Sequence, residues 1–409
     1  MSREPGDYRA GVRESLQDRA VAWLTSSGEE LISWRRDLHA HPEVAYAEHR
    51  TTERITLVLR SFGLQPRSLS VGTGVLVDIG TGPDATALRA DIDALPLPDA
   101  KRVGYASQHP GACHACGHDA HTAILLGVAG VLAEAERAGA LPGRVRLIFQ
   151  PAEERMPGGA EVAVNDGALD GVARIFALHC DPKLDVGQVG LRVGPITAST
   201  NQLDIQLTGP GGHTARPHLT VDLAYALGRL ITELPGLLSR RIDPRAAVSL
   251  VWGSVHAGSA ANAIPSSGTL SGTLRMLDGF YWDQLESIVT ELAEQIIEPT
   301  GAELKIDYDP GVPAVINDGT LVALQTQAAI AALGPEGISE TPQSMGGEDF
   351  AWYLRTVPGA LARLGVRTPG SSTGELHKSD FDIDERALAI GVRFTAALLD
   401  EIHATLKAQ

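Results

Sequence analysis

The sequence predicts an α/β protein in which a mixed-sheet αβα domain is interrupted by a smaller split βαβ (ferredoxin-like) unit. Helix and strand signals alternate over roughly the first 195 residues, change to the order β-α-β-β-α-β from about residue 201, and alternate again after Pro313. We therefore expect three segments, 1–196, 197–311 and 312–409. The first and last should form one domain, with the middle segment inserted into it.

In the first segment, the expected strands lead into polar side chains. Helices are expected at 50–62 and 120–135, and strands at 74–79, 85–89, 145–149 and 175–178. The second of these strands runs into Asp91 and Asp93, the third into Glu153 and Glu154, and the fourth ends at His179. Open α/β sheets bind ligands at the carboxyl ends of their strands, so these side chains are expected to share one site.

The middle segment carries two amphipathic helices among four strands. Strands are expected at 203–208, 247–255, 268–277 and 304–308, and helices at 222–234 and 282–297. Leu223, Leu227, Leu230 and Leu234 recur at helical spacing and predict one buried stripe. After this unit, helices are expected at 321–333 and 386–399.

Composition excludes several classes of partner. The 409 residues carry a formal net charge of −16 without a Lys/Arg-rich tract, so neither nucleic acid nor a membrane is an expected partner. No uninterrupted apolar run of 18 residues appears, and residues 1–20 lack the apolar core of a signal peptide. With three cysteines a disulfide framework is not expected, and the expected location is cytoplasmic.

The motif HACGHDAH (residues 114–121) is the strongest chemical signal in the chain. Cys116 and His118 offer a thiolate and an imidazole two residues apart, which suit a metal of zinc-like softness. Taken alone, the pair also fits a buried cysteine beside a surface histidine. Cys113 and Cys116 form a C-x-x-C, the spacing of a redox pair, which is a third alternative.

A set of further residues favours the metal site over these alternatives. Glu153 and Glu154 give one carboxylate to hold metal and one to move protons. His179 and His377 add two imidazoles elsewhere in the chain. Each residue alone is more often structural or solvated, but five ligand-type groups with a spare carboxylate indicate a hydrolytic metal centre.

Seven motifs together resemble one known family. They are RDLHAHPE (36–43), LRADIDALP (88–96), ACGHD (115–119), FQPAEE (149–154), GGHTARPH (211–218), ANAIP (261–265) and MGGEDF (345–350). The chain resembles metal-dependent amidohydrolases of the aminoacylase/carboxypeptidase family, and within it the branch of hippurate hydrolases and indoleacetyl-amino-acid hydrolases. One departure is the segment RMPGG (155–159) after the Glu pair, where related chains often carry a glycine run directly.

The resemblance implies a catalytic domain with two divalent metal ions, zinc, manganese, nickel or cobalt. It assigns Cys116 as a bridge between the metals and Glu153 as the general base. The remaining metal ligands would be His118, Glu154, His179 and His377. Asp91, Asp93 and Asp119 are expected to support these ligands without binding metal themselves.

The resemblance also implies that the inserted unit is a lid through which a homodimer forms. His213 and Asn262 would meet the scissile carbonyl, with His213 acting on the partner subunit's metal site. Arg275 would pair with the substrate carboxylate, and Gly347 would line the substrate site.

The implied reaction is hydrolysis of an N-acyl-amino acid, or of a short peptide, to a carboxylate and a free amino acid. A dipeptidase or carboxypeptidase on the same two-metal centre is the alternative enzyme. A metal-binding scaffold is a non-enzymatic alternative, which the spare base Glu153 argues against because binding metal needs no such group.

Overall fold

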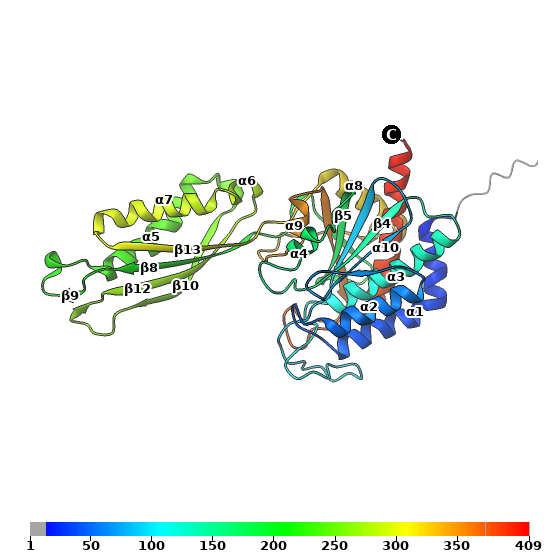
Figure 1. Ribbon diagram of the computed structural model, residues 1–409, viewed down its shortest axis with the longest axis horizontal. Helices are drawn as coiled ribbons and strands as arrows, with labels where there is room; N and C mark the ends of the chain where they lie inside the picture. Colours follow the sequence, from blue (N-terminus) through cyan, green and yellow to red (C-terminus); the bar gives the residue numbers. More distant parts are fainter. Residues whose placement is uncertain (1–13, 373, 409) are drawn as a thin grey trace, which may run out of the picture.

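The computed structural model describes residues 14–372 and 374–408, and it arranges them in two bodies joined by extended strands (Figure 1). The larger body holds an eight-stranded sheet in the order β1-β2-β4-β3-β5-β16-β6-β15. Its strands are β1 (Arg67–Ser68), β2 (Val75–Ile79), β3 (Ala85–Asp91), β4 (Arg144–Gln150), β5 (Val172–Asp185), β6 (Val189–Leu191), β15 (Ile338–Glu340) and β16 (Gly359–Arg367).

Helices cover both faces of this sheet. One core contains residues of α1 (Leu16–Ala40), α2 (His49–Ser61), α3 (His118–Arg137), α8 (Gly319–Leu333) and α10 (Arg386–Ala408). A second core contains residues of α4 (Ala160–Asn165) and α9 (Ala351–Leu354). Strand β3 serves both, because Leu88 and Ala90 enter the first core whereas Ala85 and Ala87 enter the second. A strand buried on both faces is typical of a parallel sheet between helical layers.

The strand directions are mixed, as predicted. Strand β3 pairs in parallel with β4 and β5, and β5 pairs in parallel with β16. Strands β2 and β4 are antiparallel, as are β16 and β6. The parallel central strands bring the carboxyl ends of β3, β4 and β16 to one edge, where the predicted site residues follow.

The smaller body is a four-stranded antiparallel sheet with two helices on one face (Figure 1). Its elements run β8 (Thr200–Thr208), α5 (Leu223–Arg241), β10 (Ser249–Ala257), β12 (Ser267–Arg275), α7 (Leu285–Ile297) and β13 (Glu303–Val312), in the sheet order β10-β12-β8-β13. This is the β-α-β-β-α-β order expected from the sequence. The stripe on α5 is buried in a core that belongs to this body alone.

Short elements complete the chain. Helix α6 (Gly279–Trp282) precedes α7, β9 (Gly212–His213) pairs with β11 (Ala263–Ile264), and β7 (Gly194–Pro195) pairs with β14 (Ile316–Asn317).

The structure corrects three sequence-based expectations. His179 does not end a strand, because β5 continues to Asp185 and keeps pairing with β16 along that length. Helix α5 does not end at Leu234 but continues through Pro235, since Leu238 in its last turns packs into the core. No helix is predicted from the sequence over α1, because the buried face of this helix mixes apolar residues with a charged one, Arg35.

Among the described residues, the helices do not include one long and apolar enough to cross a membrane.

Two glycines inside helices give a matched test of this packing. In α3, a Cβ on Gly130 would lie 2.7–2.8 Å from the Trp23 indole of α1, whereas a Cβ on Gly228 in α5 would meet nothing within 4 Å. We expect Gly130→Ala to lower the free energy of unfolding by about 1–3 kcal/mol through overpacking. Gly228→Ala should raise it by up to about 1 kcal/mol, because alanine favours the helix.

Urea unfolding followed by circular dichroism measures both substitutions, with the transitions of the two bodies fitted separately if they separate. A Gly130→Ala protein as stable as the parent would contradict the close contact between α1 and α3.

Candidate metal centre

A sharp turn places Cys116 and His118 on either side of the start of α3. Gly117 caps the helix with φ of 86°, a backbone conformation that favours glycine. A Cβ at this position would also lie 2.9 Å from the Sγ of Cys180. Gly117 therefore lets the chain turn tightly enough for Cys116 and the first helical residue, His118, to face the same space.

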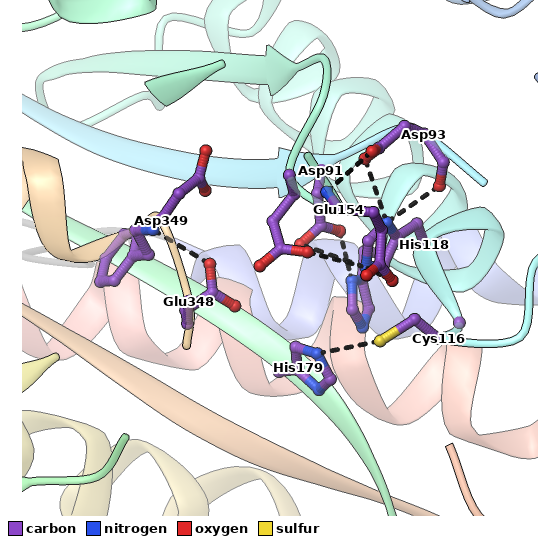
Figure 2. Close-up of polar contacts among 12 residues, drawn as sticks. Asp91, Asp93, Cys116, His118, Glu154, His179, Glu348 and Asp349 are labelled. Atoms are coloured by element: carbon purple, nitrogen blue, oxygen red, sulfur yellow. Dashed lines mark hydrogen bonds and ion pairs between the residues drawn. The ribbon is translucent and has the colours of Figure 1, made fainter. Parts of the chain in front are cut away.

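Hydrogen bonds orient two imidazoles toward that space. The Nδ1 of His118 donates to the carbonyl of Asp93 at 2.9 Å, and the Nδ1 of His179 donates to the carbonyl of Cys180 at 2.8 Å. A carbonyl can only accept, so both histidines carry a proton on Nδ1, and Nε2 is the nitrogen that the neutral imidazole offers as a metal ligand. The Nε2 of His179 lies 3.5 Å from the Sγ of Cys116 (Figure 2).

The turn after β4 presents the Glu pair. Ala152 adopts a left-handed φ of 55°, and its N–H donates to the Oε1 of buried Glu48 at 2.8 Å. The N–H of Glu154 donates to the Oδ2 of Asp93 at 2.9 Å. Left-handed backbone is costly for alanine and persists only where its surroundings hold it. Glu48 and Asp93 therefore fix the direction in which Glu153 and Glu154 point.

The five predicted ligands come together in two groups that share one residue. Cys116, His118 and His179 form one group, and Cys116, Glu154 and His377 form the other, with ligand atoms within 4.8 Å of one another in each. The Oε1 of Glu154 lies 3.8 Å from the Nε2 of His118 and 3.5 Å from the Nε2 of His377. Figure 2 shows Cys116, His118, Glu154 and His179 converging.

Unpartnered atoms test whether this cluster fits a metal. The Nε2 of His118 and the Oε1 of Glu154 are buried and lack a hydrogen-bond partner among the described residues. Both are lone-pair donors that face each other at a distance too long for a hydrogen bond. Thiolate, imidazole and carboxylate together are a usual ligand set for divalent transition metals. The residues present therefore fit divalent metal ions.

Charge supports the same conclusion. Arg89 is fully buried and donates to Asp91 at 2.5 Å, to Asp349 at 2.8 Å and to Glu348 at 3.1 Å. Arg89 thus carries one positive charge against three carboxylates. A fourth carboxylate, Glu153, lies close to Glu348 and Asp349. Buried carboxylates in excess of cations are unfavourable without added positive charge.

The acid–base properties of two groups reflect this surplus. Burial, and then repulsion from Glu348 and Glu154, raise the pKa of Glu153 well above its usual range. Burial, and then the charge of Glu154, raise the pKa of the Cys116 thiol in the same way. A bound cation reverses such shifts for a coordinating thiol, which is then deprotonated.

Two other buried groups have structural roles. His121 joins Asp91 and His118 in a third cluster, but its Nδ1 lies 2.5 Å from Asp91 and its Nε2 accepts the N–H of Cys180 at 2.8 Å. Both ring nitrogens of His121 are therefore occupied. Asp119 pairs with Arg35 at 2.7 Å, and its Oδ2 lies 2.7 Å from the Nδ1 of His39.

Cys113 and Cys116, the two cysteines of the C-x-x-C motif, have different surroundings. Cys113, Cys116 and Cys180 are all free and buried. The Sγ of Cys113 lies 4.0 Å from the carbonyl of Pro98, whereas Cys116 faces His179. The geometry thus favours metal binding by Cys116 over the C-x-x-C alternative.

The predicted residues of the inserted unit lie at its two opposite ends. His213 and Asn262 are exposed, and β9 and β11 pair next to them. Figure 1 shows β9 at the end of the smaller body farthest from the large sheet. The structure therefore does not bring His213 and Asn262 to the metal ligands of their own chain.

Arg275 and Gly347 lie at the other end, where the two bodies join. Arg275 donates to the hydroxyl of Thr200 at 3.1 Å and to the carbonyl of Met345. A Cβ on Gly347 would lie 2.7 Å from the Oγ1 of Thr200 and 3.0 Å from Val312, so this glycine packs against the roots of β8 and β13.

Sequence reasoning missed three residues that shape the site. Glu48 carries no sequence signal, since it reaches the Glu pair only through the fold. Arg89 and Glu348 do stand inside the motifs LRADIDALP and MGGEDF, but their pairing joins segments 259 residues apart in the chain.

Comparisons with known proteins agree with this geometry. Peptidase family M20/M25/M40 matches residues 87–401 of the chain. The N-acetyl-L-cysteine deacetylase of Bacillus subtilis is 38% identical over 368 residues, which cover 89% of this chain and 86% of that protein. A Rhodococcus jostii protein named putative glutamate–cysteine ligase 2-3 is 48% identical over 412 residues, which cover 97% of this chain. The chain spans about half, 51%, of the length of that second relative.

A solved structure gives the same picture. The Bacillus subtilis YXEP protein, named as a dinuclear metal binding peptidase from the M20 family, has a TM-score of 0.81 at 34% identity and covers 93% of this chain and 99% of its own. The resemblance drawn from the motifs, the mixed α/β fold and the amidohydrolase class of enzyme are confirmed. The chain belongs to Peptidase family M20/M25/M40.

Proposed function

We propose that this chain hydrolyses the amide bond of N-acyl-amino acids, releasing a carboxylate and a free amino acid, with two divalent metal ions per subunit. The observation that carries the proposal is a buried carboxylate, Glu153, that lies near His118 and Glu154 but belongs to neither of the two groups that together hold the five proposed ligands. When bound, the metals supply Lewis acidity, which lowers the pKa of water and polarises the acyl oxygen.

Cys116 belongs to both ligand groups and would be shared between the ions. His118 and His179 would complete one set of ligands, and Glu154 and His377 the other. Zinc, manganese, nickel and cobalt all suit such donors. Asp93 holds His118 and Glu154 through its backbone carbonyl and its side chain, and so would position one ligand of each ion.

Glu153 would act as the general base. It takes a proton from the attacking water and returns it to the leaving nitrogen. Its burial among Glu348, Glu154 and Asp349 raises the pKa of its carboxyl and so favours proton acceptance.

The substrate would lie between the two bodies. Arg275 at the junction would pair with the substrate carboxylate, since a guanidinium suits bidentate carboxylate binding, and Gly347 would line the same region. His213 and Asn262 would stabilise the oxyanion from the partner subunit in a homodimer. Segments 1–196 and 312–409 would then form the catalytic domain, and 197–311 a lid that also dimerises.

The names of the relatives favour N-acyl-amino acids over peptides as substrates. A panel of N-acetyl, N-benzoyl and long-chain acyl amino acids, run beside dipeptides on metal-loaded protein, tests the choice. Three free cysteines, one of them a ligand, suit a reducing compartment, and we place the protein in the cytoplasm.

Cys116→Ser should lower the content of both metals, because the shared ligand is lost. Elemental analysis of the purified variant measures this, and chelation of the parent protein should abolish activity until divalent metal is restored. Cys113→Ser is the matched control, since Cys113 is also buried but belongs to neither ligand group. Full metal content with a normal rate in Cys116→Ser would refute the shared ligand.

The Glu pair should show two separate phenotypes. Glu153→Gln should keep metal and KM but lose about 10²–10⁴-fold in kcat, the usual worth of general-base catalysis. Glu154→Gln should lose metal. Steady-state kinetics and metal analysis of both variants decide, and exchanged phenotypes would reverse the two roles.

Catalysis by His213 in trans should be restored by mixing. His213→Ala and Glu153→Gln proteins are each expected to be inactive, but a heterodimer contains one site with its own Glu153 and the partner's His213. Activity should therefore reappear after subunits exchange, which two affinity tags can verify. A mixture that stays inactive despite confirmed exchange would show that His213 does not act in trans.

A further inference from the structure

A groove of about 610 Å³ lies beside the metal centre. Its walls include Cys180, Met345, Arg363 and Leu376. Cys180 follows the proposed ligand His179, and Leu376 precedes the proposed ligand His377, so the groove adjoins both ligand groups. A substrate held at the centre therefore has room to extend into it.

The backbone register places Arg363 on the same side of the sheet as His179. Strands β5 and β16 are parallel, and Arg363 is the direct partner of His179. Partner residues on neighbouring strands project to the same face, and His179 turns toward Cys116 on that face. On the other side, Arg363 is paired with Gly190 of β6, where a Cβ would lie 3.2 Å from the Cβ of Arg363, so the glycine permits this close approach.

The guanidinium of Arg363 has no hydrogen bond or ion pair within residues 14–372 and 374–408. Other arginines near the groove are engaged: Arg367 donates to Asp185 at 2.6 Å, and Arg275 donates to Thr200 and Met345. The nitrogens of Arg363 are open to solvent, and a planar guanidinium with five donors suits a bidentate anionic ligand.

The other charges that line the groove cancel in number. Arg367 is paired with Asp185, which leaves Lys183 and Arg363 against Asp181 and Glu375. Of the two arginines that line the groove, Arg363 is therefore the one without an ion-pair partner among the described residues.

We propose that this groove receives the amino-acid part of the substrate and that Arg363 pairs with a carboxylate on its side chain. The enzyme then prefers N-acyl derivatives of acidic amino acids. This rests on the proposed function, in which Arg275 at the same junction takes the α-carboxylate. Arg363 in the groove and Arg275, which bonds the groove residue Met345, together match a substrate with two carboxylates, and the volume exceeds what an α-carboxylate alone requires.

N-acetyl-L-glutamate and N-acetyl-L-glutamine test the proposal, because they differ in side-chain charge but hardly in shape. On metal-loaded protein we expect KM to be about 10- to 100-fold lower for the glutamate substrate, the usual worth of a charge-assisted hydrogen bond, with similar kcat. Arg363→Met should remove this preference by raising KM for the glutamate substrate only. Arg363→Lys should restore part of it, because the charge is kept.

Arg174→Met is the matched control. Arg174 is a half-buried arginine on the neighbouring strand β5, but it bonds Thr86 and lies outside the groove. The preference should survive in this variant. Arg363 neighbours His179, so elemental analysis of all variants shows whether its replacement has disturbed metal binding. If Arg363→Met folds poorly, the Arg363→Lys protein still tests the proposal.

Equal KM values for the two substrates in the parent protein would overturn the proposal while leaving the amidohydrolase function intact. An equal rise in KM for both substrates in Arg363→Met would also overturn it, because Arg363 would then serve the α-carboxylate or the fold. Metal-loaded parent protein that cleaves no N-acyl-amino acid would overturn both this proposal and the proposed function.

Discussion

The structure depends on confining negative charge. Asp91, Glu153, Glu348 and Asp349 are buried around one arginine, Arg89, at the carboxyl ends of β3 and β4. Burying one such charge without compensation is costly, and here several share one space. Arg89 already forms ion pairs with three of the carboxylates. When Glu153, Glu154 and Cys116 are ionised, their negative charge therefore needs a further positive charge to compensate it. The same surplus that makes the site unstable by itself makes it a strong site for divalent cations.

The backbone around this charge is correspondingly constrained. Gly117 turns left-handed before α3, and Ala152 does so after β4, held by Glu48. Asp93 holds His118 by its carbonyl and the N–H of Glu154 by its carboxylate, so one residue aligns donors from two elements. Such supports decide which lone pairs face inward. The proposed ligands are therefore oriented by the protein before any ion arrives, which would lower the cost of binding it.

Much of this was predictable from the sequence, for identifiable reasons. The helices α3, α5 and α7 carry strong apolar periodicity, and the central strands are short runs that end in polar motifs. The five proposed ligands could be predicted because cysteine, histidine and glutamate side chains together form a usual ligand set for a transition metal. Glu48 and Arg363 could not be found, since each acts through contacts across more than 100 residues of chain, Glu48 with Ala152 and Arg363 beside His179. Helix α1 is not predicted because buried Arg35 interrupts its apolar face, and that charge is balanced by Asp119, Asp382 and Glu385 only when the chain is folded.

The inserted unit poses a separate geometric problem. Its two ends carry different candidate groups: Arg275 touches the loop at Met345, while His213 and Asn262 stand at the opposite end beside β9. Strands β8, β12 and β13 connect the ends, and a paired antiparallel sheet cannot fold back on itself to bring them together. Nine residues of β8 at about 3.3 Å each already separate the ends by roughly 30 Å. A rotation about the junction moves the unit as a whole and leaves Arg275 near the pivot. If both ends serve one reaction, either the distal end swings far over the sheet or it meets the metal centre of a second chain. A rigid rotation keeps the distance between the two ends, so the first route would need the sheet to bend, whereas the second would not. This is the physical reason for proposing a dimer.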